Sequence, residues 1–467
     1  MSGLECTEVN ISSKDCSIRW NPEFFLNADM DKFKILSLFD CKALSEIAFV
    51  TDGEHGSPDW DNTSNIKYVT AEFIKPNEIM NAPMRTISLV QDMKNARCRL
   101  MEHDVLIYSV GVYAGYVCCA EPHLFPANIP RSVGLIRLNS QSEFTPGFLS
   151  VFLNCKYGRF QSVRLCAGNA QPVLAIENIE SLIIPKLNNK LQTDVDFIYQ
   201  AAYKKRLEAK ESYSIAREIL YCSLGLSDFN HSTQNTSVKN FSEVTESERL
   251  DAEYYHPKYD ELMERIHANA EKIVLVKDIG IENHRGVQPD YIESGEIAVV
   301  NSKNILEDGL DYEGFSATSR ASWELTPKAH IEKDDILIYT TGANIGRAAI
   351  YRGNKPALAS NHVNILRVNY KRPQYVAFVI HSMIGRLQTE RLSTGSAQQE
   401  LYPSDIDEFV IPLVSEDLQA EIESLLDKSF ALREQSKALL KAATRAVEIA
   451  IEQDEAAGME FLHKFSS

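Results

Sequence analysis

The chain carries the same ordered series of motifs twice. The segment from Asp104 to Gly115 returns 231 positions later as the segment from Asp335 to Gly346. Further along, Gly168-Asn169-Ala170-Gln171 returns as Gly395-Ser396-Ala397-Gln398, and Ile183-Ile184-Pro185 returns as Val410-Ile411-Pro412. A repeat of this length encodes one fold used twice. The sequence therefore predicts two equivalent domains with two equivalent working surfaces.

Length and composition are those of a soluble multidomain protein. A chain of 467 residues is too long for one core and suggests two to four domains. No apolar run approaches the ~18–20 residues of a membrane helix, and no signal peptide is recognisable. All nine cysteines precede Leu224, so the second repeat has none and disulfides are no part of a shared fold. We expect reduced thiols, a cytoplasmic location and no membrane partner.

Net charge at first argues against nucleic-acid binding. The formal charge is -17, whereas contacts to phosphate need lysine and arginine. The acidic residues are concentrated in 223–340, and residues 131–222 and 341–412 are mildly basic. Ordinary surface variation explains this pattern equally well. We expect the chain to bind free DNA weakly when it is alone.

Each repeat shows short strands followed by a long helix. Apolar stretches rich in Val, Ile and Tyr predict strands; they are Ile66–Ala71, Asp104–Tyr108, Gly134–Leu138, Ile297–Ser302, Asp335–Tyr339 and Asn364–Val368. The predicted fold class is α+β, with two repeated mixed α/β domains separated by two long antiparallel coiled-coil helices. The predicted divisions are domain 1 (1–189), a central helix (190–224), a polar linker (225–247), domain 2 (248–415) and a C-terminal helix (416–457).

Both long helices have coiled-coil spacing. Apolar or small residues alternate at four- and three-residue intervals, and small residues would allow two helices to approach closely. The predicted pairing positions include Leu191, Val195, Ile198, Ala202, Leu418, Ile422, Leu425, Leu432 and Leu439. We prefer pairing of these two helices within the chain. The alternative is two separate amphipathic helices, each packed on its own domain.

Catalytic motifs are not recognisable. The sequence contains no GxxxxGK[ST] phosphate loop, and the GxxxG spacings are typical of tight turns after a strand. Its histidines do not match a zinc motif, and no nucleophile with a matching base is evident. We therefore expect a chain without catalytic residues, metal or cofactor of its own.

Polar residues in the predicted loops suit the reading of DNA bases. Arg, Asn, Gln, Ser and Thr pair with base edges, and the loops differ between the copies more than the strands do. A solvated loop side chain is the alternative for each residue taken singly. The candidates for DNA binding are Thr51, His55, Ser57, Ser109, Tyr113, Arg131, Arg159, Arg164, Asn169, Gln171, His284, Arg285, Asn301, Thr340, Thr341, Asn344, Arg347, Asn361, His362, Arg386, Arg391, Ser396, Gln398 and Gln399.

This ordered series of motifs resembles the specificity (S) subunits of type I restriction-modification systems. The resemblance lies in residues 335–350, 392–401 and 409–413 and in the helix start at Leu418, and it covers nearly the whole chain. The first copy departs from it, with Tyr113 and Tyr116 where the second copy has Asn344 and Arg347.

The resemblance implies a non-catalytic subunit that reads double-stranded DNA. Each domain would read one half of an interrupted site. The helices, roughly 45 Å long at ~1.5 Å per residue, would space the readers about one DNA turn apart. Implied partners are two methyltransferase (M) subunits, which carry S-adenosylmethionine, and motor-nuclease (R) subunits. The alternatives are a protein-interaction scaffold of a related anti-phage defence system and an enzyme with an unfamiliar site.

Overall fold

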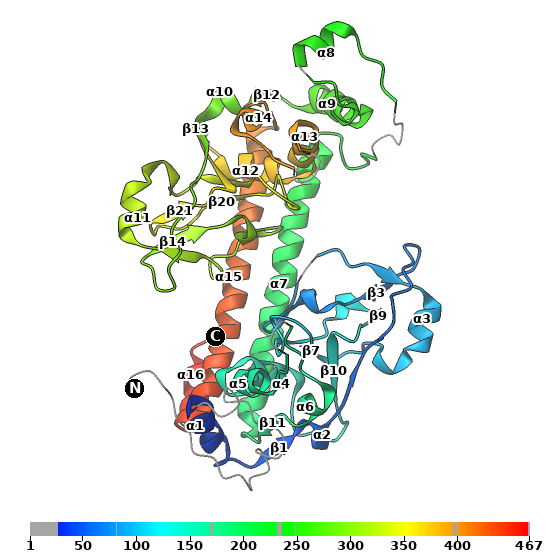
Figure 1. Cartoon of the computed structure of the whole chain (residues 1–467), viewed down its shortest axis with the longest axis vertical. Coiled ribbons are helices and arrows are strands. Elements are labelled where there is room, and N and C mark those ends of the chain that lie inside the picture. The colour runs from blue at the N-terminus through cyan, green and yellow to red at the C-terminus, as the bar shows by residue number, and fades with distance from the viewer. Residues whose placement is uncertain are drawn as a thin grey trace. The chain divides into compact units, whose positions relative to one another are not determined.

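The computed structural model describes residues 27–80, 82–168, 171–230, 236–247, 249–395 and 399–465. The chain divides into two units (Figure 1). Unit 1 comprises Met1–Glu208 with Ala431–Ser467, and unit 2 comprises Ala209–Phe430. Each long helix therefore contributes one part to each unit. Among the described helices, none has both the length and the apolar character that crossing a membrane requires.

Unit 1 is built on a four-stranded antiparallel sheet. Its strand order is β2 (Ala48–Asp52), β10 (Val133–Leu138), β7 (Val105–Tyr108) and β8 (Val117–Cys119). A smaller sheet has the order β6 (Thr86–Ile87), β3 (Ile66–Tyr68) and β9 (Ala127–Asn128), in which β3 and β9 run parallel. Two short pairs complete the strands: β1 (Cys41–Ala43) with β11 (Ile183–Pro185), and β4 (Ile74–Lys75) with β5 (Glu78–Ile79).

Unit 2 repeats this topology and adds one strand, β18 (His330–Ile331), to the second sheet. Its main sheet has the order β13 (Gly280–Arg285), β22 (Val363–Val368), β19 (Ile336–Tyr339) and β20 (Ala348–Ile350). Its second sheet has the order β17 (Ser316–Thr318), β14 (Ile297–Val300), β21 (Ala357–Ala359) and β18. The short pairs are β12 (Lys272–Leu275) with β23 (Val410–Leu413), and β15 (Ile305–Leu306) with β16 (Gly309–Leu310). The predicted fold class is confirmed, and each predicted strand is present.

Apart from the last helix of unit 1 and the first helix of unit 2, the helices follow the same order along the two repeats. The helices of unit 1 are α1 (Asn27–Leu36), α2 (Leu44–Ile47), α3 (Leu89–Lys94), α4 (Pro146–Asn154), α5 (Lys156–Leu165), α6 (Ile176–Glu180) and α16 (Glu455–His463). Those of unit 2 are α8 (Phe241–Ser247), α9 (Pro257–Asn269), α10 (Val276–Ile279), α11 (Arg320–Leu325), α12 (Pro373–His381), α13 (Met383–Leu392) and α14 (Pro403–Asp407). Helix α8 lies in the segment 225–247, which its polar composition had indicated as a linker.

Helices α4 and α12 form the centre of each core. In both, nearly every residue is buried, because the main sheet covers one face and the long helices cover another. A buried Asp–Arg pair recurs beneath the sheets. The Arg137 guanidinium donates to both carboxylate oxygens of Asp104 at 2.7 Å, and Arg367 does the same to Asp335 at 2.8 and 2.9 Å. Each carboxylate is almost fully buried, and its desolvation is offset by this bidentate bond and by one backbone amide, that of Met101 for Asp104 and that of Glu332 for Asp335, each at 2.7 Å.

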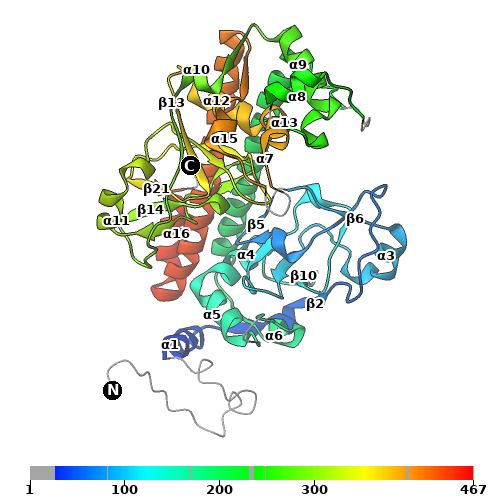
Figure 2. The same cartoon turned by 45° about the horizontal axis from the view of Figure 1, so that its top comes forward.

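The long helices α7 (Asn189–Ser223) and α15 (Glu416–Glu452) pair antiparallel (Figures 1 and 2). In unit 1 the Ser436 hydroxyl donates to the Ala202 carbonyl at 2.8 Å, and in unit 2 the Ser429 hydroxyl donates to the Ala209 carbonyl at 2.8 Å. As the residue number rises on α7 it falls on α15, which defines the antiparallel direction. Bonds from side chain to backbone across the seam require small residues there, as the spacing had indicated.

Candidate nucleic-acid interface

Four strands of each main sheet meet at one end. In unit 2, β13 and β19 end there and β22 and β20 begin there; in unit 1, β2, β7, β10 and β8 do the same. We call the loops at this end the strand-end face. Together with the last residues of the strands that end there, it comprises the described residues 51–57, 109–116, 130–132, 167–168 and 171–173 in unit 1, and 284–289, 340–347, 360–362, 394–395 and 399–401 in unit 2.

The same backbone hydrogen bonds join these loops in both units. In unit 1 the Ser109 amide donates to the Ser132 carbonyl at 2.9 Å, and the Leu174 amide donates to the Ser109 carbonyl at 2.8 Å. In unit 2 the Thr340 amide donates to the His362 carbonyl at 3.2 Å, and the Leu401 amide donates to the Thr340 carbonyl at 2.9 Å. Duplicated backbone contacts hold side chains of different chemistry in equivalent positions.

A glycine at the end of the first strand is required in each unit. A Cβ on Gly53 would lie 1.8 Å from the Ile129 carbonyl oxygen, and one on Gly286 would lie 2.1 Å from that of Ala359. The close approach allows the Val287 amide to donate to the Ala359 carbonyl at 3.1 Å, and the Glu54 amide to donate to that of Ile129 at 3.1 Å. Only glycine permits backbones to come this close.

The unit 1 face presents several of the predicted residues to solvent. The exposed members are His55, Ser57, Tyr113, Arg131 and Gln171. The Arg131 guanidinium has no ion-pair partner in the part of the chain that the structure describes. Thr51 and Ser109 are buried, so their side chains support the loops. Asn169 lies outside the described residues.

The unit 2 face differs in its side chains. The exposed members are Asn344, His362 and Gln399, and those partly exposed are His284, Arg285, Arg347 and Asn361. The Arg285 guanidinium donates to the Leu401 carbonyl at 3.0 Å and lies over the Tyr402 ring at 4.8 Å. Thr340 and Thr341 are buried, and neither hydroxyl has a hydrogen-bond partner among the described residues. Ser396 and Gln398 lie outside the described residues.

Five predicted residues lie outside this face: Arg159 of α5, Arg386 of α13, Arg164, Arg391 and Asn301. Arg164 is buried against the Phe33 ring at 4.6 Å, and Arg391, at the equivalent position, lies over the Tyr254 ring at 4.7 Å. Each guanidinium group therefore covers an aromatic ring from a helix that precedes the sheets of its unit: Phe33 belongs to α1, and Tyr254 belongs to the 3-10 helix Ala252–Tyr255. The Asn301 amide accepts from the Tyr291 hydroxyl at 2.6 Å and donates to the Ser316 hydroxyl at 3.0 Å, beside the second sheet of unit 2.

The loop after the third strand is held to a helix differently in each unit. In unit 1, Arg159 of α5 lies over the Tyr116 ring at 4.6 Å and donates to the Ala114 carbonyl at 3.0 Å. Tyr116 in turn stacks on Tyr113, with ring centroids 5.4 Å apart and planes at 13°. Burial lowers the pKa of Arg159, and the ring faces offset the lost hydration of its guanidinium.

In unit 2 the arginine of the helix binds a carboxylate and not an aromatic ring. Glu307, in the turn between β15 and β16, forms ion pairs with Arg386 of α13 and with Arg347, whose Nε lies 3.4 Å from Oε2. Burial raises the pKa of Glu307. The hydrogen bond from Arg386 and the charges of His381, Arg386 and Arg347 outweigh that effect, so its pKa is lowered overall.

Sequence reasoning overlooked the acidic members of these surfaces. Asp52 ends β2 and pairs with His55 at 2.8 Å and Arg97 at 3.4 Å, whereas Arg285 stands at the equivalent position of β13. Asp52 and Glu307 were both overlooked because a search for residues that read bases or bind phosphate favours hydrogen-bond donors, and a carboxylate only accepts. For Asp52 the available signal was the opposite charge of Arg285 at the aligned position of the second copy.

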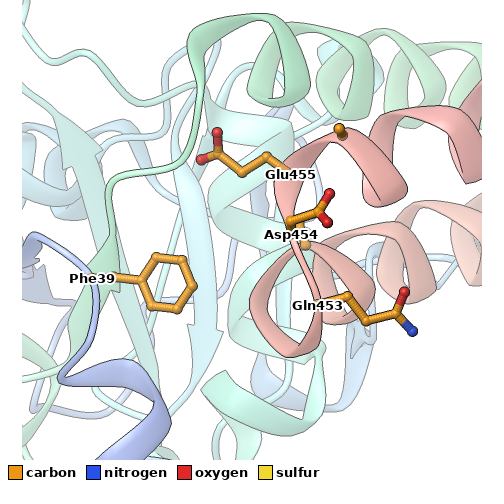
Figure 3. Close-up of a pocket in the computed structure, with 6 residues that line it drawn as sticks. Phe39, Gln453, Asp454 and Glu455 are labelled. Atoms are coloured by element: carbon orange, nitrogen blue, oxygen red, sulfur yellow. The ribbon is translucent and has the colours of Figure 1, made fainter.

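The described residues contain no group of three or more His, Cys, Asp or Glu side chains placed to hold a metal ion. A hollow in unit 1 is lined by Phe39, Gln453, Asp454 and Glu455 (Figure 3). Its carboxylates act on the backbone: Asp454 accepts from the Ala457 amide and Glu455 from the Asn188 amide, both at 2.8 Å. Both carboxylates in the hollow therefore serve as acceptors for backbone amides.

Two solved structures align with most of the chain. A type I restriction-modification S subunit from M. genitalium is 14% identical, with 91% of this chain and 96% of that chain covered and a TM-score of 0.39. The HsdS subunit from Thermoanaerobacter tengcongensis is 13% identical, with 91% and 96% covered and a TM-score of 0.27.

No curated protein matches the chain. A family match exists for the second repeat, and it begins in β12 and ends within α15. Residues 274–442, which carry the unit 2 strand-end face, match the family model of the type I restriction modification DNA specificity domain.

Proposed function

We propose that this chain is the DNA sequence-recognition subunit of a type I restriction-modification complex. The observation that carries the proposal is the family match of residues 274–442, joined to the duplication that gives unit 1 the same strand order and loop hydrogen bonds. One repeat matches a DNA specificity domain and the other shares its architecture. Each unit would then read one half of an interrupted site.

The strand-end faces are the proposed reading surfaces. Equivalent positions hold Arg131 in unit 1 and Asn361 in unit 2, each just before the second strand of the main sheet. Arginine pairs bidentately with guanine and asparagine with adenine in the major groove. One backbone frame with different donors suits two readers of unlike sequence.

Partners would supply what the chain lacks. We propose that two methyltransferase subunits bring S-adenosylmethionine and the catalytic residues, and that motor-nuclease subunits join for cleavage. Their phosphate contacts would compensate for the net charge of -17, which opposes strong DNA binding by this chain alone.

Methylation of genomic DNA tests the proposal. With the chain present, sequencing of modified bases is expected to find one interrupted motif methylated. Deletion of the chain is expected to abolish that methylation, and its return on a plasmid to restore it. The purified chain alone is expected to methylate and cleave nothing. Methylation that persists after deletion would refute the proposal.

A protein-interaction scaffold without DNA reading is the second candidate, and the negative charge favours it. Mobility shifts with the reconstituted methyltransferase complex separate the two functions. Recognition predicts binding that depends on DNA sequence and weakens with salt. A scaffold predicts complex assembly with no preference among DNA sequences.

A further inference from the structure

The ion cluster on unit 2 has more donors than its carboxylate can satisfy. Each oxygen of Glu307 faces a different guanidinium: Oε1 binds Arg386, and Oε2 lies 3.4 Å from Nε of Arg347. The Nε2 atom of His381 lies 3.9 Å from Oε1, too far for a hydrogen bond. Three donor groups from α13, α12 and the strand-end loop thus surround one planar anion.

His381 presents a buried donor without a well-placed acceptor. Its Nδ1 accepts the backbone N–H of Ala348 at 3.2 Å, so a neutral ring carries its proton on Nε2. The side chain is 6% exposed, and Nε2 forms no hydrogen bond of good geometry in the described part of the chain; the Glu307 backbone carbonyl is near enough to act on the His381 pKa but not to complete such a bond. A buried N–H with a poorly placed acceptor is costly, and a tetrahedral anion reaches in directions that a carboxylate does not.

Unit 1 shows that the fold does not require this cluster. The position of His381 is taken by Asn154, whose Oδ1 accepts the equivalent N–H, that of Val117, at 3.2 Å. Tyr116 replaces Arg347, and Pro76 stands in the turn that carries Glu307 in unit 2. The arginine of the helix is common to both units. The second arginine, the histidine and the carboxylate therefore occur together and only in unit 2.

We propose that Arg347, Arg386 and His381 form a phosphate-binding site that Glu307 occupies in the free chain, and that a phosphodiester of bound DNA displaces the carboxylate. The DNA assignment rests on the proposed function. Arg347 closes the 340–347 loop of the strand-end face, so a backbone phosphate held here would lie beside the bases being read. A guanidinium group binds phosphate as it binds carboxylate, through two parallel N–H donors.

The need to displace Glu307 is expected to lower the apparent affinity for DNA. In the free chain Glu307 neutralises the two arginines, so nonspecific anions compete poorly for the site. DNA must first move the carboxylate, which lowers the apparent affinity by the fraction of chains in which the site is open. Glu307→Gln removes that competition and keeps the size of the side chain.

Inorganic phosphate tests the site without DNA. Thermal unfolding of the full chain is compared in potassium phosphate and potassium chloride at equal ionic strength. Glu307→Gln is expected to gain about 1–3 °C from phosphate, where the wild type gains little. Glu416→Gln is the matched control, because Glu416 pairs with Lys371 beyond the opposite end of β22. The double variant Glu307→Gln/Arg386→Gln is expected to lose the gain.

DNA binding by the reconstituted complex then tests the ligand. Glu307→Gln is expected to tighten binding about three- to tenfold, and Arg386→Gln to weaken it on all sequences and reduce the salt slope by about 1. If Glu307→Gln responds to phosphate no more than Glu416→Gln, the site is refuted and Glu307 only fastens the loop. If phosphate stabilises Glu307→Gln but no complex binds DNA, the anion site stands and both the DNA assignment and the proposed function fall.

Discussion

At the scale of single residues, His381 links folding to pH. Burial in the core of unit 2 is the largest cause that lowers its pKa, to about 4 from 6.5; the charge of Glu307 opposes this shift, whereas Arg386 and Arg347 reinforce it. Because the folded-state pKa is the lower one, the unfolded chain binds more protons between these values. Stability is therefore expected to fall as pH drops from about 6.5 towards about 4, by on the order of 3 kcal/mol at most.

His381→Asn isolates this contribution. Asn154 occupies the equivalent place in unit 1 and accepts the same kind of N–H, so the exchange keeps the acceptor and removes the titration. Urea unfolding at several pH values is expected to show a flatter acid side for the variant. An unchanged pH profile would mean that His381 titrates normally. The lowered pKa of Glu307 adds a loss at still lower pH that both proteins share.

Gly53 is expected to tolerate no side chain. Gly53→Ala would drive a Cβ into the Ile129 carbonyl, and the loop would have to move away. We expect a loss of about 2–4 kcal/mol in the free energy of unfolding. Gly56→Ala, three residues later on an exposed turn where the nearest atom belongs to the flexible Glu54 side chain, is the control and is expected to cost under ~1 kcal/mol. Equal losses in denaturant unfolding would contradict the packing argument.

Which polar residues lie on the strand-end face could not be predicted from residue type. Arg386 and Arg391 both belong to α13, yet the helix turns the first towards Glu307 and the second towards Tyr254. The sequence shows only two arginines five positions apart. Their surroundings come from elements distant in the chain, so their roles follow from tertiary packing. The exposure of His55, Tyr113 and Arg131 was easier to predict, because loops between short strands lie at the surface.

At the scale of elements, the seam between the long helices was predictable because its period is written in the sequence. Leu191, Val195, Ile198 and Ala202 are buried as their spacing predicts. On α15, Leu425 and Leu439 lie at the border of the seam, and their neighbours Leu426 and Leu440 are the more buried. An α-helix turns every 3.6 residues, so a strict heptad pattern drifts along a helix this long. Adjacent leucines accommodate the drift.

Close helix approach predicts intolerance to larger side chains. Ala202 is fully buried where Ser436 donates to its carbonyl, so Ala202→Leu would push the helices apart. We expect a loss of about 1–3 kcal/mol. Ala431→Leu makes the same change at an exposed position of α15 and is expected to be nearly neutral. Thermal unfolding of both variants distinguishes a packed seam from two helices that merely lie near each other, for which both variants would behave alike.

At the scale of the whole molecule, duplication with divergence is the organising feature. The two units share strand order, loop hydrogen bonds and a buried Asp–Arg pair. They differ where side chains reach solvent: Arg131 against Asn361, Asp52 against Arg285, and Tyr116 against Arg347. Sequence motifs identified the shared frame because core residues and glycines are constrained. The motifs carried less information about the two strand-end faces, because the charged side chains there differ between the units.

Two independent readers predict separable effects on the recognised motif. Arg131→Ala removes an exposed donor from unit 1, and Asn361→Ala removes its counterpart from unit 2. Loss of one bidentate base contact is expected to cost about 1–3 kcal/mol at one base pair and to relax its specificity. Genome-wide sequencing of modified bases is expected to show each variant accepting new bases in a different half of the interrupted motif. The double variant is expected to show both changes together. Relaxation of the same half by both variants would contradict one reader per unit, and uniform loss of methylation would mean that these residues support folding or phosphate binding.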